Sequence, residues 1–88
     1  MPILHVSRKQ KLLERLQSDP SDFTWDEACT LMRQCGFELK KGSGSARAFV
    51  HTITKQKVRL HEPHPRPTLV RYMVKALIGA LKDAGEIT

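Results

Sequence analysis

Residues 38–60 read ELKKGSGSARAFVHTITKQKVRL, and this stretch decides the fold. Polar and apolar side chains alternate along it with a period of two, which is typical of β-strands. Residues 38–41, 46–52 and 55–60 are therefore predicted to be strands. Residues 42–45 form a glycine–serine turn between the first two. Three consecutive strands with short connections predict an antiparallel sheet.

Helical patterns flank this stretch on both sides. A first helix is expected from Ser7 and a second from Thr24, because each opens with an S/T-x-x-E/Q capping pattern. Gly36 is expected to end the second helix, and a last helix to run from about Thr68 to Ala84. The resulting order α-α-β-β-β-α predicts an α+β fold. Its three-stranded antiparallel sheet would carry helices on one face and water on the other.

A chain of 88 residues makes one domain, with residues 1–22 as an N-terminal helical extension and residues 23–88 as the core. No apolar run is long enough to cross a bilayer, and the N-terminus lacks the pattern of a secretory signal. Cys29 and Cys35 are expected to be core thiols, which favours a reducing cytoplasm.

The positive charge is concentrated in one part of the chain. Residues 1–38 contain five Lys/Arg and six Asp/Glu, whereas residues 39–82 contain ten Lys/Arg and only Glu62. Such a segment attracts a polyanion, because neutralising phosphates releases condensed counterions. Nucleic acid is the favoured partner, and an acidic protein or an ordinary solvated surface are the alternatives.

Strand alternation predicts which side chains share a side of the sheet. If the apolar residues of the second and third strands face the helices, one water-facing side carries Arg47, Phe49, His51, Lys57, Arg59 and His61. Cations hold phosphates, and an exposed aromatic ring can stack an unpaired base. The alternative is that Phe49 turns inward and the basic row is merely solvated.

Several short motifs follow one another in a recognisable order. They are Gly36-Phe37, then Gly44 to His51 (GSARAFVH), then Pro63-His64-Pro65, and finally Ala84-Gly85. In order and spacing they resemble the HicA toxins of bacterial toxin–antitoxin pairs, over Trp25 to Ile87. The resemblance implies a fold like that of a double-stranded-RNA-binding domain (dsRBD-like). It also implies ribonuclease activity on messenger RNA and neutralisation by a HicB antitoxin.

This chain departs from the family at one important position. The family's active-site histidine belongs to a Gly-Ser-His turn, and Ala46 occupies that position here. A metal-free cleavage of RNA still needs a base for the 2′-hydroxyl, an acid for the leaving oxygen and cations near phosphorus. The histidines that could replace the missing one are His51, His61 and His64.

The residues predicted to contact RNA are Lys41, Ser45, Arg47, Phe49, Lys57 and Arg59. Ser45 has an alternative role as an ordinary turn former. No cofactor and no metal are expected, because no carboxylate or thiol cluster completes the His61-x-x-His64 pair.

Three hypotheses follow. The chain is a HicA-like toxin that cleaves messenger RNA, a non-catalytic RNA-binding module on the same scaffold, or a domain whose basic face binds an acidic antitoxin.

Overall fold

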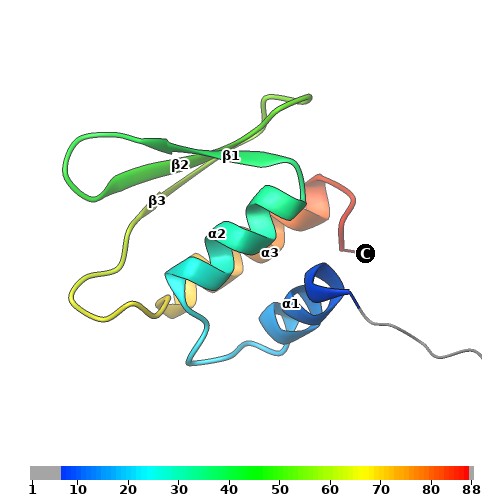
Figure 1. Cartoon of the computed structure of the whole chain (residues 1–88), viewed down its shortest axis with the longest axis horizontal. Helices are drawn as coiled ribbons and strands as arrows, with labels where there is room; N and C mark the ends of the chain where they lie inside the picture. The colour runs from blue at the N-terminus through cyan, green and yellow to red at the C-terminus, as the bar shows by residue number, and fades with distance from the viewer. Residues whose placement is uncertain (1–6, 88) are drawn as a thin grey trace, which may run out of the picture.

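The computed structural model describes residues 7–87 and contains three helices and three strands (Figure 1). In chain order they are α1 (Arg8–Gln17), α2 (Trp25–Gln34), β1 (Phe37–Lys41), β2 (Ala46–His51), β3 (Lys57–His61) and α3 (Arg71–Asp83). This order and the antiparallel sheet confirm the predicted α+β fold. Residues 1–6 of the predicted N-terminal extension lie outside the described residues.

The two helices before the sheet begin at the predicted capping residues. At α1, the Ser7 hydroxyl accepts the backbone N–H of Gln10 at 3.1 Å. At α2, the Thr24 hydroxyl accepts the backbone N–H of Glu27 at 3.1 Å, and the Glu27 carboxylate accepts that of Thr24 at 3.0 Å. This reciprocal capping box satisfies N–H groups that have no partner within the helix. Gly36, with φ of 89°, turns the chain from α2 into β1.

The sheet has the strand order β1-β2-β3, so β2 is central. Its register places Lys40, Ala48 and Arg59 in one row across the three strands, and Ala46 opposite His61 two residues further along, in the next row on the same face. Directly opposed residues of antiparallel strands project to the same face. Side chains that are distant in the sequence are therefore neighbours on the sheet.

All three helices lie on one side of the sheet (Figure 1). α2 contacts β1, α3 contacts β3, and α1 packs against both helices on the side away from the sheet. One hydrophobic cluster joins these layers; its most buried side chains are Leu16, Phe23, Leu31, Met32, Phe37, Phe49, Val74, Leu77 and Leu81. No helix of residues 7–87 covers the opposite face, which we call the open face. In β2 and β3 it carries Ala46, Ala48, Val50, Lys57, Arg59 and His61.

The last helix begins at Arg71, later than the predicted start at Thr68. The reason is that residues 67–69 run extended beside residues 23–25, where two backbone hydrogen bonds of 2.7 and 2.8 Å join the segments. A backbone engaged in this pairing cannot form the first turn of a helix. At its other end, the connection from β3 is fixed by the N–H of Glu62, which donates to the Ser45 carbonyl at 2.8 Å.

Candidate functional site

Phe49 faces the helices, so its predicted place on the water-facing side is wrong. Its side chain is 1% exposed, and its ring centroid lies 5.5 Å from that of Trp25. The strand must bury either Phe49 or its small neighbours Ala46 and Ala48, and the ring removes more apolar surface from water. A base cannot stack on Phe49 in this fold.

Arg47 shares the orientation of Phe49, and its predicted place on the water-facing side is wrong as well. Its Nε donates to Glu62 Oε1 at 3.0 Å, and its Nη1 donates to the carbonyls of Gly44 and Ala46 at 2.9 and 2.7 Å. The side chain is 13% exposed. Arg47 therefore clamps the β1–β2 turn to the end of β3.

His51 also lies on the helix-facing side, at the end of β2, against its predicted placement. Its Nδ1 accepts the backbone N–H groups of Ile53 and Thr54, each at 3.2 Å, and its ring meets Phe37 edge-on at 5.0 Å. A Cβ on Gly36 would lie 3.0 Å from Nε2 of His51. These contacts assign His51 to the β2–β3 turn and to the close packing under it.

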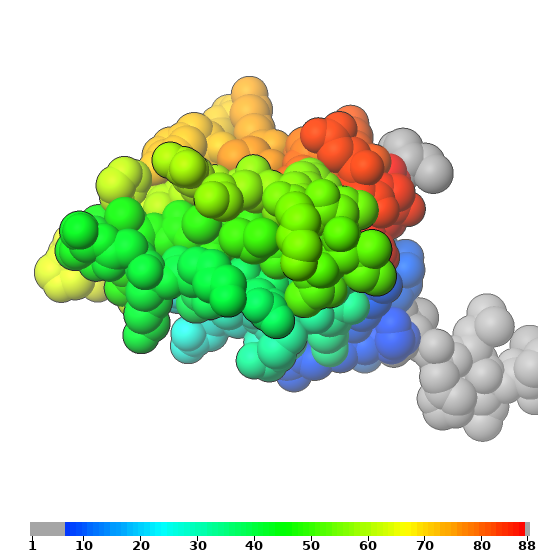
Figure 2. All heavy atoms as spheres, turned by 90° about the horizontal axis from the view of Figure 1, so that it is seen from above, coloured from blue at the N-terminus to red at the C-terminus, as the bar shows by residue number. Residues whose placement is uncertain are grey.

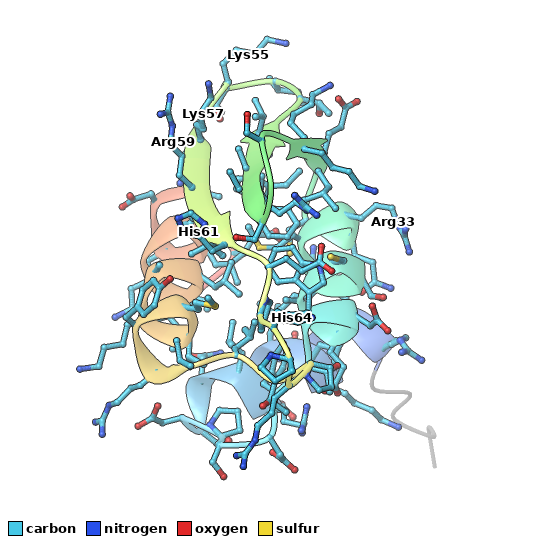
Figure 3. All side chains as sticks on the ribbon, turned by 90° about the vertical axis from the view of Figure 1, so that its left-hand side faces the viewer. Arg33, Lys55, Lys57, Arg59, His61 and His64 are labelled. Carbon is cyan, nitrogen blue, oxygen red and sulfur yellow. The ribbon has the colours of Figure 1, made fainter. Side chains whose placement is uncertain are left out.

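β3 follows the expected alternation, and Lys57, Arg59 and His61 project from the open face (Figure 3). All three residues are exposed. Among residues 7–87, Lys57 and Arg59 form no ion pair, whereas Lys40 contacts Glu38 at 3.1 Å. Both members of that pair are well exposed, so the contact is weak. The β3 side of the open face thus carries a row of free positive charge.

The central strand forms the floor between these cations. Ala46 and Ala48 are small, so the surface over β2 is hollowed, and the positive side chains of the neighbouring strands rise on both sides. We call this hollow of about 510 Å³ the sheet depression; it is lined by Lys40, Lys41, Gly42, Ala46, Arg47, Ala48, Lys57, Arg59, Leu60, His61 and Tyr72. Figure 2 views the molecule from the sheet side, with the sheet in green and α3 in orange beyond β3.

His61 lines both the sheet depression and a second hollow. We call the second one the loop depression; it has a volume of about 630 Å³ and is lined by Ser21, Ser45, His61, Glu62, Pro63, His64, Pro65, Arg66, Thr68, Leu69, Val70 and Met73. Ser45 Oγ lies 3.2 Å from Nδ1 of His61. With Nδ1 engaged, Nε2 is the nitrogen of this exposed ring left for other partners.

The remaining predicted residues lie around this centre. His64 is exposed in the connection that follows β3, and it lines the loop depression (Figure 3). Lys41 is exposed at the end of β1, opposite Arg47 in the register, and lines the sheet depression. Lys41, Ser45, Lys57, Arg59, His61 and His64 therefore each line at least one of the two depressions. Arg47 lines the sheet depression too, but its guanidinium group is held by Glu62 and two carbonyls. Phe49 and His51 line neither depression.

Tyr72 belongs to this surface and was missed by the sequence analysis. It stands in the first turn of α3, is 55% exposed and lines the sheet depression. The helical periodicity of the sequence could have identified it. Met73, Val74, Leu77 and Leu81 form the buried face of α3, and Tyr72 lies outside that face.

The two cysteines are free thiols, as predicted, and neither lines either depression. Burial raises the pKa of Cys29 to about 11, and nearby Asp26 adds to the rise. Burial likewise raises the pKa of Cys35 to about 11. Thiols that stay protonated at neutral pH are poor nucleophiles.

Residues 7–87 hold no group of three or more His, Cys, Asp or Glu side chains placed to bind a metal ion. None of their helices has the length and apolar character to span a membrane.

The family model described as the HicA toxin of bacterial toxin–antitoxin matches residues 25–86. The match includes α2, the whole sheet and α3, and it contains both depressions apart from Ser21. Searches of curated proteins and of solved structures gave no match. Because the matched residues make up more than half of the chain, the protein belongs to the HicA family, the toxins of bacterial toxin–antitoxin systems.

Proposed function

We propose that this toxin binds and cleaves messenger RNA on its open face and is neutralised by a HicB-type antitoxin. The observation that carries the proposal is the position of His61. This imidazole is hydrogen-bonded to Ser45, lies in line with the free cations Lys57 and Arg59, and opens onto both depressions.

The sheet depression suits a sugar–phosphate backbone in size and charge. Lys40 and Arg59 stand on either side of Ala48, two strand spacings or about 10 Å apart at the backbone. A phosphate placed over the alanine can be reached by flexible cations from both strands. Contacts of this kind supply affinity that falls steeply with salt.

Cleavage would proceed by attack of a ribose 2′-oxygen on the adjacent phosphorus. His61 Nε2 takes the 2′-hydroxyl proton while the bond from oxygen to phosphorus forms, and the bond to the 5′-oxygen breaks. The leaving oxygen takes a proton from His64, the second imidazole bordering the loop depression. Arg59 stabilises the charge that develops on the phosphoryl oxygens. The products are a 2′,3′-cyclic phosphate and a 5′-hydroxyl.

His61 also compensates for the missing turn histidine. Ala46 lies directly opposite His61 in the β2–β3 register. The imidazole from β3 therefore stands beside the position at which the family places its own histidine. The imidazole of His61 on β3 can then act as the catalytic base in place of a histidine at position 46 on β2.

The test is induced expression with growth and total RNA followed over time. Growth arrest and RNA fragments ending in cyclic phosphate are expected for the unmodified chain, and both should be lost in His61→Ala. Lys57→Ala should weaken binding about equally for all RNA sequences and reduce the salt slope by about 1. The matched control is Lys11→Ala, an exposed lysine on α1, remote from the open face.

The antitoxin is tested by co-expressing its gene with the toxin. A HicB-type partner should restore growth, and the purified complex should bind no RNA. Arrest that persists in His61→Ala and His64→Ala would overturn the histidine mechanism.

A second candidate function is RNA binding without cleavage. The observation that favours it is Ala46, which removes the family's histidine from the turn. In that case the unmodified protein binds RNA with the same salt dependence, and incubation with RNA yields no product.

A further inference from the structure

Tyr72 differs from every other Phe, Trp and Tyr in the chain. The chain contains five such residues, all within residues 7–87. Four are buried, with Trp25 the most exposed of them at 7%, whereas Tyr72 is 55% exposed. Exposure of one large ring is noteworthy in a domain that buries the others.

The fold does not account for this ring. α3 packs through Met73, Val74, Leu77, Ala80 and Leu81, and Tyr72 is not among the residues of the hydrophobic cluster. Within residues 7–87 its hydroxyl makes no hydrogen bond with another side chain or with the backbone. A ring that is more than half exposed, lies outside the hydrophobic cluster and has no hydrogen-bond partner among residues 7–87 is available for a ligand.

Tyr72 lies on α3 beside β3, at the edge of the sheet depression. α3 contacts β3, and Gln56 Nε2 donates to the Ala80 carbonyl at 2.9 Å, which ties the strand's entry to the helix. Tyr72, near the other end of this contact, lines the sheet depression together with Arg59 and His61. An aromatic surface thus adjoins a guanidinium group and an imidazole.

We propose that Tyr72 is a stacking platform for an unpaired nucleobase, and that the site therefore takes single-stranded RNA. The inference rests on the proposed RNA function. A nucleotide presents a flat apolar base beside a charged phosphate, and the depression offers a ring beside cations in the same arrangement. Bases within a duplex are already stacked on their neighbours and cannot reach the ring.

The experiment measures the affinity of the full chain for labelled RNA with 2′-O-methyl sugars, which lack the attacking hydroxyl and stay intact. Single strands are compared with a duplex of the same sequence. Tyr72→Ala should weaken single-strand binding roughly 5- to 100-fold, because stacking on an aromatic side chain supplies a large part of the affinity for each base. Tyr72→Phe should bind like the unmodified chain, and duplex binding should be weak and equal in all variants.

The matched control is Ile53→Ala, which removes an apolar side chain that is 82% exposed in the turn between β2 and β3. It should leave binding unchanged. Equal thermal unfolding of Tyr72→Ala and the unmodified chain verifies that the ring is not needed for folding.

A direct signature comes from Tyr72→Trp. Its added indole emission should be quenched by single-stranded RNA, whereas Trp25, which is buried, should respond little. Unchanged affinity in Tyr72→Ala, or full activity in Tyr72→Leu, would overturn the stacking role. Loss of antitoxin binding without loss of RNA binding would make the ring a protein contact instead. If the unmodified chain binds no RNA, the proposed function itself fails.

Discussion

Ser45 Oγ lies 3.2 Å from Nδ1 of His61, across the pairing that joins the start of β2 to the end of β3. The backbone reinforces this contact, since the Ser45 carbonyl accepts the N–H of Glu62 at 2.8 Å. The ring of an exposed residue is thereby held in one orientation. Ser45 is a positioning residue in the proposed mechanism, because it acts on RNA only through the imidazole.

Ser45→Ala should slow RNA cleavage about fivefold, the rate equivalent of one hydrogen bond of about 1 kcal/mol. The affinity for uncleavable RNA should stay the same, so the effect falls on kcat and on the pH profile. Ser45→Thr keeps the hydroxyl and should restore both. The cleavage rate is measured in time courses at several pH values. A rate in the threonine variant that is as low as in the alanine variant would contradict the prediction.

Ala48→Leu should reduce RNA cleavage on the order of 100-fold. Ala48 lines the sheet depression, so a bulky side chain there displaces the RNA backbone from the cations on β1 and β3. The substitution changes no charge, and its site on the open face spares the core. Ala48→Ser, similar in size to alanine, is the control and should remain active. RNA cleavage and thermal unfolding are measured together; activity in the leucine variant would show that RNA does not cross β2.

Arg47→Ala should lower the free energy of unfolding by about 1–3 kcal/mol, because it removes three hydrogen bonds of a largely buried guanidinium group. Arg59→Ala should leave stability unchanged and weaken RNA binding. Urea unfolding followed by circular dichroism distinguishes the two arginines. The reverse pattern would mean that Arg47 is a ligand contact.

The capping box at α2 makes stability depend on pH in a defined direction. Burial opposes ionisation of Glu27, but hydrogen bonds from Thr24 and Arg15 outweigh it and lower its pKa. A carboxyl whose pKa is lower in the folded state stabilises the protein above the pKa of the unfolded chain. That contribution is present above about pH 4.3 and is lost as the pH falls further.

Glu27→Gln keeps an acceptor for the capping box but loses the carboxylate charge and the ion pair with Arg15. It should therefore make the free energy of unfolding less dependent on pH in the acid range and lower it near neutral pH by up to about 1 kcal/mol. Chemical unfolding between pH 3 and pH 7 provides the measurement. The control is Asp26→Asn, since Asp26 is an exposed acid in the same turn. An unchanged pH dependence in the acid range for the glutamine variant would contradict the assigned role.

The elements of this fold could be predicted because their signals are local. Thr24 and Glu27 fix a helix start within one turn, and Gly36 marks its end through a backbone conformation that favours glycine. The start of α3 was misplaced because residues 67–69 bond to a segment more than forty positions earlier in the chain. No local pattern encodes that pairing.

The faces of the sheet were harder to predict than its strands. In β3 the apolar residues Val58 and Leu60 alternate with basic residues, so the sequence alone predicts which side faces the helices. In β2 both sets contain apolar residues, and the choice depends on Trp25, which provides a packing partner for Phe49 on the helix side. Because β2 faces the opposite way to the prediction, His51 lies away from the site and the Arg47 guanidinium group is held by Glu62 and backbone carbonyls. Ser45 lies in the turn before the strand and stays within hydrogen-bond distance of His61.

The segment between β3 and α3 is secured at Glu62 by the Ser45 carbonyl and at residues 67–69 by the chain before α2. Residues 63–66 thus connect two segments that are each held by backbone hydrogen bonds. Insertions or deletions there would shift His64 and Arg66 while leaving the hydrophobic cluster intact. Under the proposed function, a change in the length of this segment would alter the preference for RNA substrates while the hydrophobic cluster and the sheet stay as they are.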